Sequence, residues 1–227
     1  MNDSVPEIDT NQNVISAVDS KTCYTIFTRL AVQNPHPKSE LNYINTFTLL
    51  VAVVLSAQAT DVGVNKVTEK LFSIADTPEK MVQLGEEKVR DIIKSLNYFN
   101  TKAKNVVALS HILLTRFDGV VPDSLDALVT LPGVGQKTAS VVANVAFHKP
   151  FIAVDTHIFR VANRIPLVQT KTAIETQSAL EAIVPREFLH NAHHWLILLG
   201  RYICKARKPE CSRCPINDLC CFPDKIF

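Results

Sequence analysis

The hydrophobic and polar residues along most of the chain follow the spacing of amphipathic helices. Residues 47–59 are almost all apolar, which predicts a helix buried on every side but too short to span a bilayer. Strand-like alternation of apolar and polar positions is rare. The pattern therefore predicts an all-α protein, with further helices over residues 24–32, 102–117, 172–183 and 192–203 and two or three more within 62–96.

Turn residues mark the ends of several predicted helices. The Pro-His-Pro segment after Asn34 stops the first helix, because proline lacks a backbone N–H and restricts the residue before it. Thr77 followed by Pro78 is a strong helix start, with the threonine as N-cap and the proline in the first turn.

The composition of the 227 residues is that of a globular protein, with 47% hydrophobic and 20% charged residues, which excludes a disordered chain. The net charge of +2 is uneven, because four acids and one base among the first 21 residues leave the remainder basic. A basic body suits a nucleic-acid partner, although charge alone does not establish one. Residues 1–17 lack an apolar stripe and a secretory signal, so we expect a mobile acidic tail.

Leu-Pro-Gly-Val-Gly at residues 131–135 is a tight turn signal followed by a helix with small apolar residues at i, i+3, i+4 and i+7. Such a turn exposes backbone N–H groups at the helix N-terminus, which with the helix dipole bind anions. Gly133, Val134 and Gly135 are therefore predicted to contact a phosphate, with Lys137 in the first helical turn beside them. The alternative is a plain helix–helix turn with a solvated lysine.

Asp155 directly precedes another amphipathic helix and is predicted to be its N-cap. Eighteen residues, enough for one helix and a return loop, separate it from Lys137. The two helix N-termini can therefore meet, with the carboxylate facing the amine.

Five of the six cysteines lie in the last 24 residues, and four of them have the spacing Cys-x6-Cys-x2-Cys-x5-Cys. Thiols this close in sequence predict a metal site more readily than disulfides. Tetrahedral sulfur suits both zinc and iron–sulfur, and the spacing leaves both open. The predicted ligands are Cys204, Cys211, Cys214 and Cys220, whereas Cys23 and Cys221 are expected to be non-ligands.

Two further groups of polar residues lie in this half of the chain. Lys205, Arg207 and Lys208 follow the first predicted ligand and form a basic loop that a bound metal would hold for phosphate binding, or else a solvated loop. His193 and His194 lack a cysteine or acidic partner at suitable spacing, so we expect them to be packed or hydrogen-bonded.

These motifs resemble, in the same order, those of the endonuclease III family of base-excision DNA glycosylases. Residues 131–139 resemble the family's helix-hairpin-helix element, and residues 154–157 resemble its catalytic aspartate segment. The cysteine spacing is that of the family's [4Fe–4S] cluster, so the resemblance favours this cofactor over zinc. It extends from about residue 24 to residue 220 and implies catalytic roles for Lys137 and Asp155.

The resemblance implies two helical lobes with DNA lying across the cleft between them. Residues 39–149 resemble the family's six-helix barrel domain with the helix-hairpin-helix, and residues 18–38 and 150–227 resemble its iron–sulfur cluster domain. Lys137 and Asp155 would then come from different lobes and meet at the mouth of the cleft.

The chain departs from the family at Asn97 and Tyr98, where the family usually has glycine and a leucine that acts as an intercalating wedge. Asparagine tolerates the left-handed backbone conformation fairly well, and Tyr98 could stack on a base. The alternative for Tyr98 is an aromatic packed in a helix–helix turn. The resemblance also places Gln58 inside the duplex beside the flipped nucleotide.

The implied function is a base-excision-repair DNA N-glycosylase with AP lyase activity on oxidised or damaged pyrimidines. The neutral amine of Lys137 would attack C1′ of the extruded nucleotide, displace the base and leave a Schiff base. β-Elimination would then break the strand 3′ to the abasic site. Asp155 would take up a proton or stabilise the developing oxocarbenium charge.

Two alternatives remain, a monofunctional glycosylase of other base specificity and a non-catalytic DNA-damage-binding iron–sulfur protein. The expected partner is double-stranded DNA containing damaged pyrimidines or abasic sites. We expect a cytoplasmic, nucleoid-associated monomer with no membrane partner.

Overall fold

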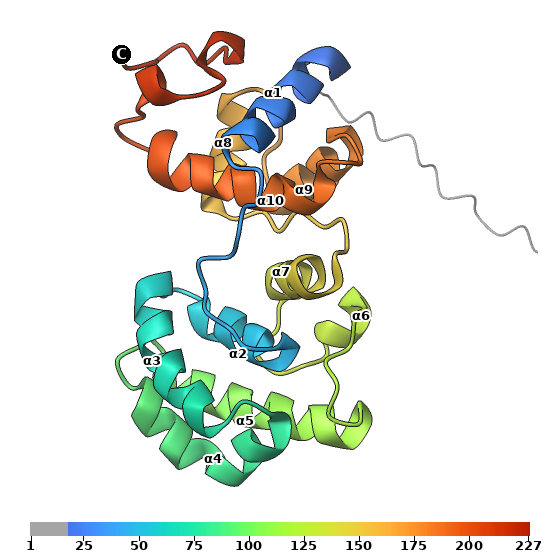
Figure 1. The fold of residues 1–227 in the computed structure, drawn as a ribbon, viewed down its shortest axis with the longest axis vertical. Coiled ribbons are helices and arrows are strands. Elements are labelled where there is room, and N and C mark those ends of the chain that lie inside the picture. The colour runs from blue at the N-terminus through green and yellow to red at the C-terminus, as the bar shows by residue number, and fades with distance from the viewer. Residues whose placement is uncertain (1–17) are drawn as a thin grey trace, which may run out of the picture.

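The computed structural model describes residues 18–227, so the predicted acidic tail lies outside the described residues. Within the described chain every regular element is helical and no strand occurs, which confirms the all-α prediction. Figure 1 shows the helices arranged in two lobes along the long axis. The α-helices are α1 (Ser20–Gln33), α2 (Thr46–Ser56), α3 (Asp61–Ile74), α4 (Pro78–Ile93), α5 (Phe99–Arg116), α6 (Leu125–Leu128), α7 (Gln136–Phe147), α8 (Thr156–Arg164), α9 (Ala173–Ile183) and α10 (Leu189–Leu198).

The first lobe consists of α2 to α7 around one hydrophobic core. Its central helix is α2, in which every residue from Phe47 to Leu55 is buried, as the unbroken apolar run predicts. Ala139 and Ala143 are fully buried on α7 and let this helix pack closely on α2. Each buried leucine or valine of such a core contributes about 1.5–3 kcal/mol, so this lobe provides a rigid base for the loops at its upper end.

The second lobe combines the N-terminal helix with the C-terminal third of the chain around a separate core. Phe27 of α1 stacks on Phe188 with ring centroids 6.0 Å apart, and Trp195 Nε1 donates to the carbonyl oxygen of Asn34 at 2.8 Å. These contacts hold α1 against α10 although more than 150 residues separate them in sequence. The two cores agree with the expected pair of lobes, while the domain boundaries after residues 38 and 149 stay a prediction.

Several helix ends follow the local signals, and two differ from the prediction. Thr77 caps α4 through Lys80 N, with Pro78 as the first helical residue. The helix expected to reach residue 59 ends at Ser56, because the chain turns there: Ala59 N donates to Ser56 O at 3.0 Å. The helix expected over 192–203 is α10 followed by a π-helical turn, Leu199–Ile203. No helix in the described part of the chain is long and apolar enough to cross a membrane.

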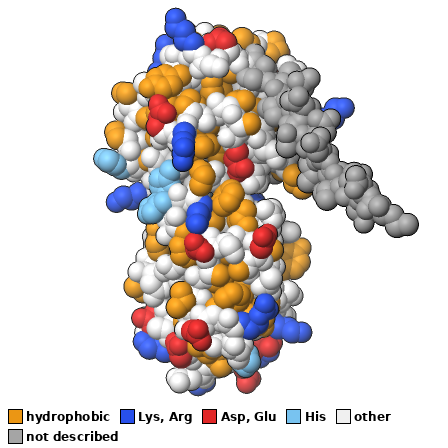
Figure 2. Space-filling model, turned by 90° about the vertical axis from the view of Figure 1, so that its right-hand side faces the viewer, with side chains coloured by type: hydrophobic (Ala, Val, Ile, Leu, Met, Phe, Trp, Pro, Cys, Tyr) orange, Lys and Arg blue, Asp and Glu red, His pale blue; other side chains and the backbone are white. Residues whose placement is uncertain are grey.

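Two segments, residues 34–45 and 148–155, cross between the lobes (Figure 1). Asn144, which is fully buried at the end of α7, holds the second crossing in place. Its side-chain nitrogen lies 3.0–3.2 Å from the carbonyl oxygens of Lys149, Phe151 and His190. Figure 2 shows histidine side chains gathered beside the waist that separates the lobes. The three hydrogen bonds of Asn144 therefore fix the second lobe relative to α7.

Candidate active site

A cavity of about 790 Å³ lies between the two lobes. One wall comes from the turn after α2, the turn before α5 and the start of α7. The other comes from the start of α8 and part of α10. Its volume is in the range of pockets that bind small organic groups. Among its lining residues are Gln58, Asn97, Lys137, Asp155 and His193.

Lys137 and Asp155 meet in this cavity, as the sequence predicts. Lys137 Nζ lies 3.9 Å from Asp155 Oδ2, and the lysine side chain is 55% exposed whereas the aspartate side chain is 10% exposed. Asp155 Oδ1 accepts hydrogen bonds from His157 N at 2.9 Å and Ile158 N at 2.8 Å, which confirms it as the N-cap of α8. One oxygen therefore holds the carboxylate in place, while the other faces the amine of the half-exposed lysine.

The hairpin before α7 has the geometry of an anion site. Gly133 has φ 79°, and a Cβ there would lie 2.9 Å from the side-chain nitrogen of Asn105, so this position requires glycine. Gly135 is the N-cap of α7, and no side chain caps this helix. Its first-turn N–H groups thus lack a side-chain acceptor and can bind an anion. The side chain of Val134 is buried and its N–H donates to Leu131 O at 3.1 Å, so this residue also builds the turn, while its contact with a phosphate stays a prediction.

Gln58, which lines the cavity, and Tyr98, which directly follows the lining residue Asn97, mark the rim of the cavity and have an unusual backbone conformation. Gln58 has φ 53° and Tyr98 has φ 57°, and both residues are exposed. In the turn before α5, the residue with the left-handed backbone is therefore Tyr98. The sequence suggested Asn97 for this conformation. Tyr98 is 65% exposed, so it is not packed inside a helix–helix turn, while its stacking on a base stays a prediction.

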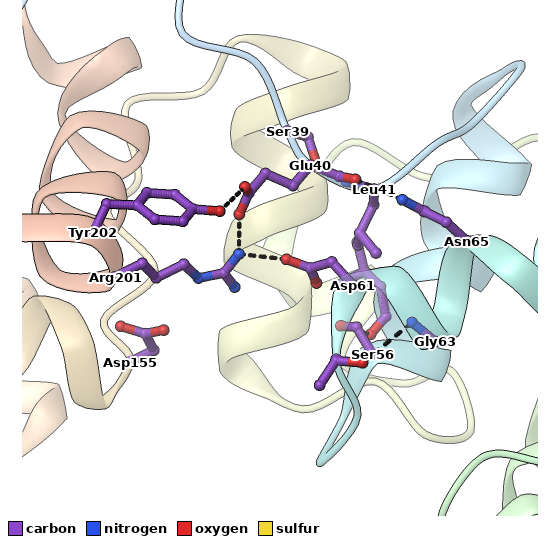
Figure 3. A network of polar contacts seen from close by, with 12 residues as sticks. Ser39, Glu40, Leu41, Ser56, Asp61, Gly63, Asn65, Asp155, Arg201 and Tyr202 are labelled. Carbon is purple, nitrogen blue, oxygen red and sulfur yellow. Dashed lines mark hydrogen bonds and ion pairs between the residues drawn. The ribbon is translucent and has the colours of Figure 1, made fainter.

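A network of charged residues that sequence analysis did not identify borders the same cavity. Figure 3 shows the guanidinium of Arg201 between the carboxylates of Glu40 and Asp61, with Tyr202 also donating to Glu40. Arg201 belongs to the second lobe and Asp61 begins α3 of the first, so the network joins the lobes across the cavity. These residues are 140 and more positions apart, and no local pattern signals their pairing.

The adjacent histidines His193 and His194 are packed, as expected. Their rings meet edge to face with centroids 5.2 Å apart, and both side chains are buried. Burial lowers the pKa of His193 to about 3 and that of His194 to about 4, so both are neutral at pH 7. They add no charge beside Lys137 and Asp155.

The four predicted cysteine ligands line a single pocket near the C-terminus, and all are free thiols. Zinc would gather four sulfurs at about 2.3 Å around one point. A [4Fe–4S] cluster also takes four thiolates, one per iron, so the four donors of this pocket fit such a cluster in number and type. The N–H of Phe222 also lies 3.5 Å from Cys220 Sγ, a type of contact that tunes iron–sulfur sites.

The predicted non-ligands lie elsewhere: Cys23 is buried on α1 and its thiol lies 3.6 Å from Ile183 O, while Cys221 is exposed. The basic loop between the first two ligands is held by α8. Arg164 donates to Lys205 O at 2.8 Å and to Ala206 O at 3.2 Å.

The side chains of the basic loop differ in how freely they can bind an anion. Arg207 and Lys208 are exposed. Lys205 forms an ion pair with Glu210, which reduces the charge that this residue can offer to an anion.

Two models of known protein families match this chain. The model of the HhH-GPD superfamily of base excision DNA repair proteins matches residues 51–186. The model of the iron–sulfur binding domain of endonuclease III matches residues 204–220, which begin and end at the first and last predicted ligands. The second match shows that the family's iron–sulfur domain is present, and the four thiols are the donors available to its cluster.

Similar proteins cover nearly the same length. Endonuclease III of Rickettsia conorii is 55% identical over 195 residues, which are 86% of this chain and 93% of that protein. Endonuclease III of Escherichia coli K12 is 52% identical over 201 residues, 88% of this chain and 95% of that protein. The structure of a trapped covalent endonuclease III–DNA intermediate superimposes with a TM-score of 0.83 at 40% identity, over 89% of this chain and 96% of the other. The chain therefore belongs to the endonuclease III family of the HhH-GPD superfamily.

Proposed function

We propose that this protein is a DNA glycosylase with AP lyase activity, which removes oxidised or damaged pyrimidines and then cleaves the strand 3′ to the abasic site. The observation that carries the proposal is the 3.9 Å approach of Lys137 Nζ to Asp155 Oδ2 inside a cavity of about 790 Å³. An amine nucleophile beside a fixed carboxylate, in a pocket that can receive an extruded nucleotide, has the parts that this reaction requires.

Lys137 supplies the nucleophile. Its unprotonated amine attacks C1′ of the extruded nucleotide, and the bond from C1′ to the base breaks with its electron pair leaving on the base. Opening of the sugar ring gives a Schiff base between Nζ and C1′. Loss of a proton from C2′ then expels the 3′ phosphate by β-elimination and breaks the strand. The exposed lysine side chain has the freedom to follow C1′ through these steps.

Asp155 supplies a fixed negative charge. Because two backbone N–H groups of α8 hold Oδ1, the carboxylate keeps its orientation while Oδ2 faces Lys137. Oδ2 can accept the proton that the attacking amine loses and can stabilise positive charge that develops on the sugar. Its low exposure strengthens this interaction, since less water screens it.

Contacts to DNA come from elements of both lobes. The uncapped N-terminus of α7 and the glycines of the preceding hairpin bind a phosphate, and Arg207 and Lys208 of the basic loop bind another. Gln58 and Tyr98, at the rim of the cavity, enter the duplex next to the extruded nucleotide. One chain supplies all these groups, which supports a monomer acting on double-stranded DNA. A location in the cytoplasm at the nucleoid, where that DNA lies, is part of the same proposal.

Cys204, Cys211, Cys214 and Cys220 hold the [4Fe–4S] cluster. When bound, the cluster cross-links the C-terminal segment, and no step of the reaction passes through it. Arg164 lies over the Phe222 ring at 4.4 Å and 3.7 Å from Cys204 Sγ while donating to the basic loop. The chain's own contacts therefore couple the cluster site to the orientation of that loop.

Borohydride trapping tests the proposal. Duplex DNA bearing thymine glycol, or an abasic site, is incubated with the protein and reduced, which converts a Schiff base into a stable protein–DNA adduct. We expect an adduct with the wild type and none with Lys137→Ala. Lys88→Ala, which removes an exposed lysine on α4, is the matched control and should retain the adduct.

Two outcomes would contradict the proposal. Base release by the wild type without an adduct would show a monofunctional glycosylase. Binding of damaged DNA with neither base release nor adduct would show a protein that only binds damage.

A further inference from the structure

Two strained turns form part of the rim of the active-site cavity. Ala57 has φ −55° and ψ 117°, Gln58 has φ 53°, and Ala59 N donates to Ser56 O at 3.0 Å. These values define a type II turn with a glutamine at its third position, where glycine is normally required. Tyr98 is the second non-glycine residue with left-handed backbone at this rim. Such strain persists only where the surrounding structure holds it, and it concentrates at functional sites.

The side chain of Asn97 connects these two turns. Its amide nitrogen donates to the carbonyl oxygen of Gln58 at 3.2 Å, across 39 positions of sequence. In the part of the chain that the structure describes, this is the sole hydrogen bond between the two turns. Asn97 precedes Tyr98 directly, so the bond fixes the spacing between the two exposed tips.

Extrusion of a nucleotide leaves a gap in the duplex and costs unstacking energy, which inserted side chains offset. Two tips can offset this cost together only if their spacing matches the gap when they enter. Resting on the proposed function, we propose that Asn97 is a positioning residue that couples Gln58 and Tyr98, so that both enter the duplex as one rigid unit. The specificity for stacked, paired lesions then depends on a side chain that touches neither the base nor C1′.

The test compares Asn97→Ala with Asn100→Ala. Asn100 is exposed in the first turn of α5, three residues after Asn97, and makes no side-chain hydrogen bond in the described part of the chain. Single-turnover base excision is measured on a duplex with a paired thymine glycol, and 2-aminopurine next to the lesion reports extrusion by its fluorescence. Asn97→Ala should slow both signals about fivefold, the effect of one exposed hydrogen bond. Asn100→Ala should match the wild type.

Two further comparisons separate coupling from other roles. With the lesion opposite an abasic gap, where little stacking is lost, the effect of Asn97→Ala should fall below about twofold. In a Gln58→Gly background, which relaxes the type II turn and removes the inserted side chain, Asn97→Ala should have no additional effect. The melting temperature of Asn97→Ala should fall by no more than about 4 °C, because one exposed hydrogen bond contributes about 1 kcal/mol or less, so the variant stays folded in the assay.

Failure of the proposed function would be visible in the wild type alone, which would then form no trapped adduct. Failure of the coupling role of Asn97 would appear in the variants. If the wild type is active and Asn97→Ala equals Asn100→Ala on the paired lesion, the coupling role is refuted. If Asn97→Ala still slows excision about fivefold in the Gln58→Gly background, Asn97 acts without Gln58 and the inference is also overturned.

Discussion

Asp155 has two functions that two substitutions can separate. Oδ1 caps α8 by accepting two backbone N–H bonds, and Oδ2 faces Lys137 at 3.9 Å. Asp155→Asn keeps an oxygen for the cap and removes the charge. Asp155→Ala removes both.

The magnitudes follow from these contacts. Loss of an N-cap costs about 1 kcal/mol, and loss of bonds to a charged acceptor costs somewhat more, so Asp155→Ala should lower the free energy of unfolding by about 1–2 kcal/mol. For a chain of this size that corresponds to a melting temperature lower by about 2–8 °C. Asp155→Asn should lose less than about 1 kcal/mol. Both variants should lose about 10²- to 10⁴-fold in single-turnover base excision, because neither has the carboxylate.

The assays are urea unfolding for stability and single-turnover excision on thymine glycol duplex for activity. Near wild-type excision by Asp155→Asn would refute the need for a negative charge beside Lys137. Equal stability of the alanine and asparagine variants would refute the capping role. The reverse order, with asparagine less stable than alanine, would show that the cap does not act through Oδ1.

Three further predictions address the crossing between the lobes, a half-buried acid and the cysteines. Asn144→Ala removes a buried donor shared by three part-buried carbonyl oxygens and should lower the free energy of unfolding by about 2–4 kcal/mol in urea. Burial raises the pKa of Glu181, so ionising this group in the folded protein lowers the free energy of unfolding. This loss is absent below about pH 4.3 and grows as pH rises. Glu181→Gln, which keeps an acceptor for Ile152 N, should therefore be more stable than the wild type at pH 7 and lack this loss of stability in urea titrations between pH 4 and 7. Cys204→Ser should lower bound iron and visible absorbance, whereas Cys221→Ser should keep both.

Each of these has a control or a contradicting result. Asn100→Ala, at an exposed site, should leave the unfolding curve unchanged, and an equally unchanged curve for Asn144→Ala would refute the anchoring of the crossing. Glu187→Gln should reproduce the pH dependence of the wild type, and the same behaviour of Glu181→Gln would mean that another group is responsible. Full iron content in Cys204→Ser would remove this cysteine from the ligand set.

The sequence alone determined the features that depend on neighbouring residues. Thr77 and Asp155 were identifiable as N-caps because the bond that makes a cap spans two or three residues. The apolar run of α2 predicted its complete burial, since no face of that helix is polar enough to meet water. The spacing of the four cysteines indicated a metal site for the same local reason.

The tertiary structure decided what depends on residues far apart. Arg201 pairs with Glu40 and Asp61 across the cavity, and no periodic pattern encodes a contact over 140 or more positions. The packing of α5 against α4 and the turn before it placed the left-handed conformation on Tyr98, although asparagine accepts this conformation more readily. Local preferences of about 1 kcal/mol are overridden when a helix must join a core worth many times more. Sequence could name Lys137 and Asp155, but only the packing of two cores brought their side chains within 4 Å.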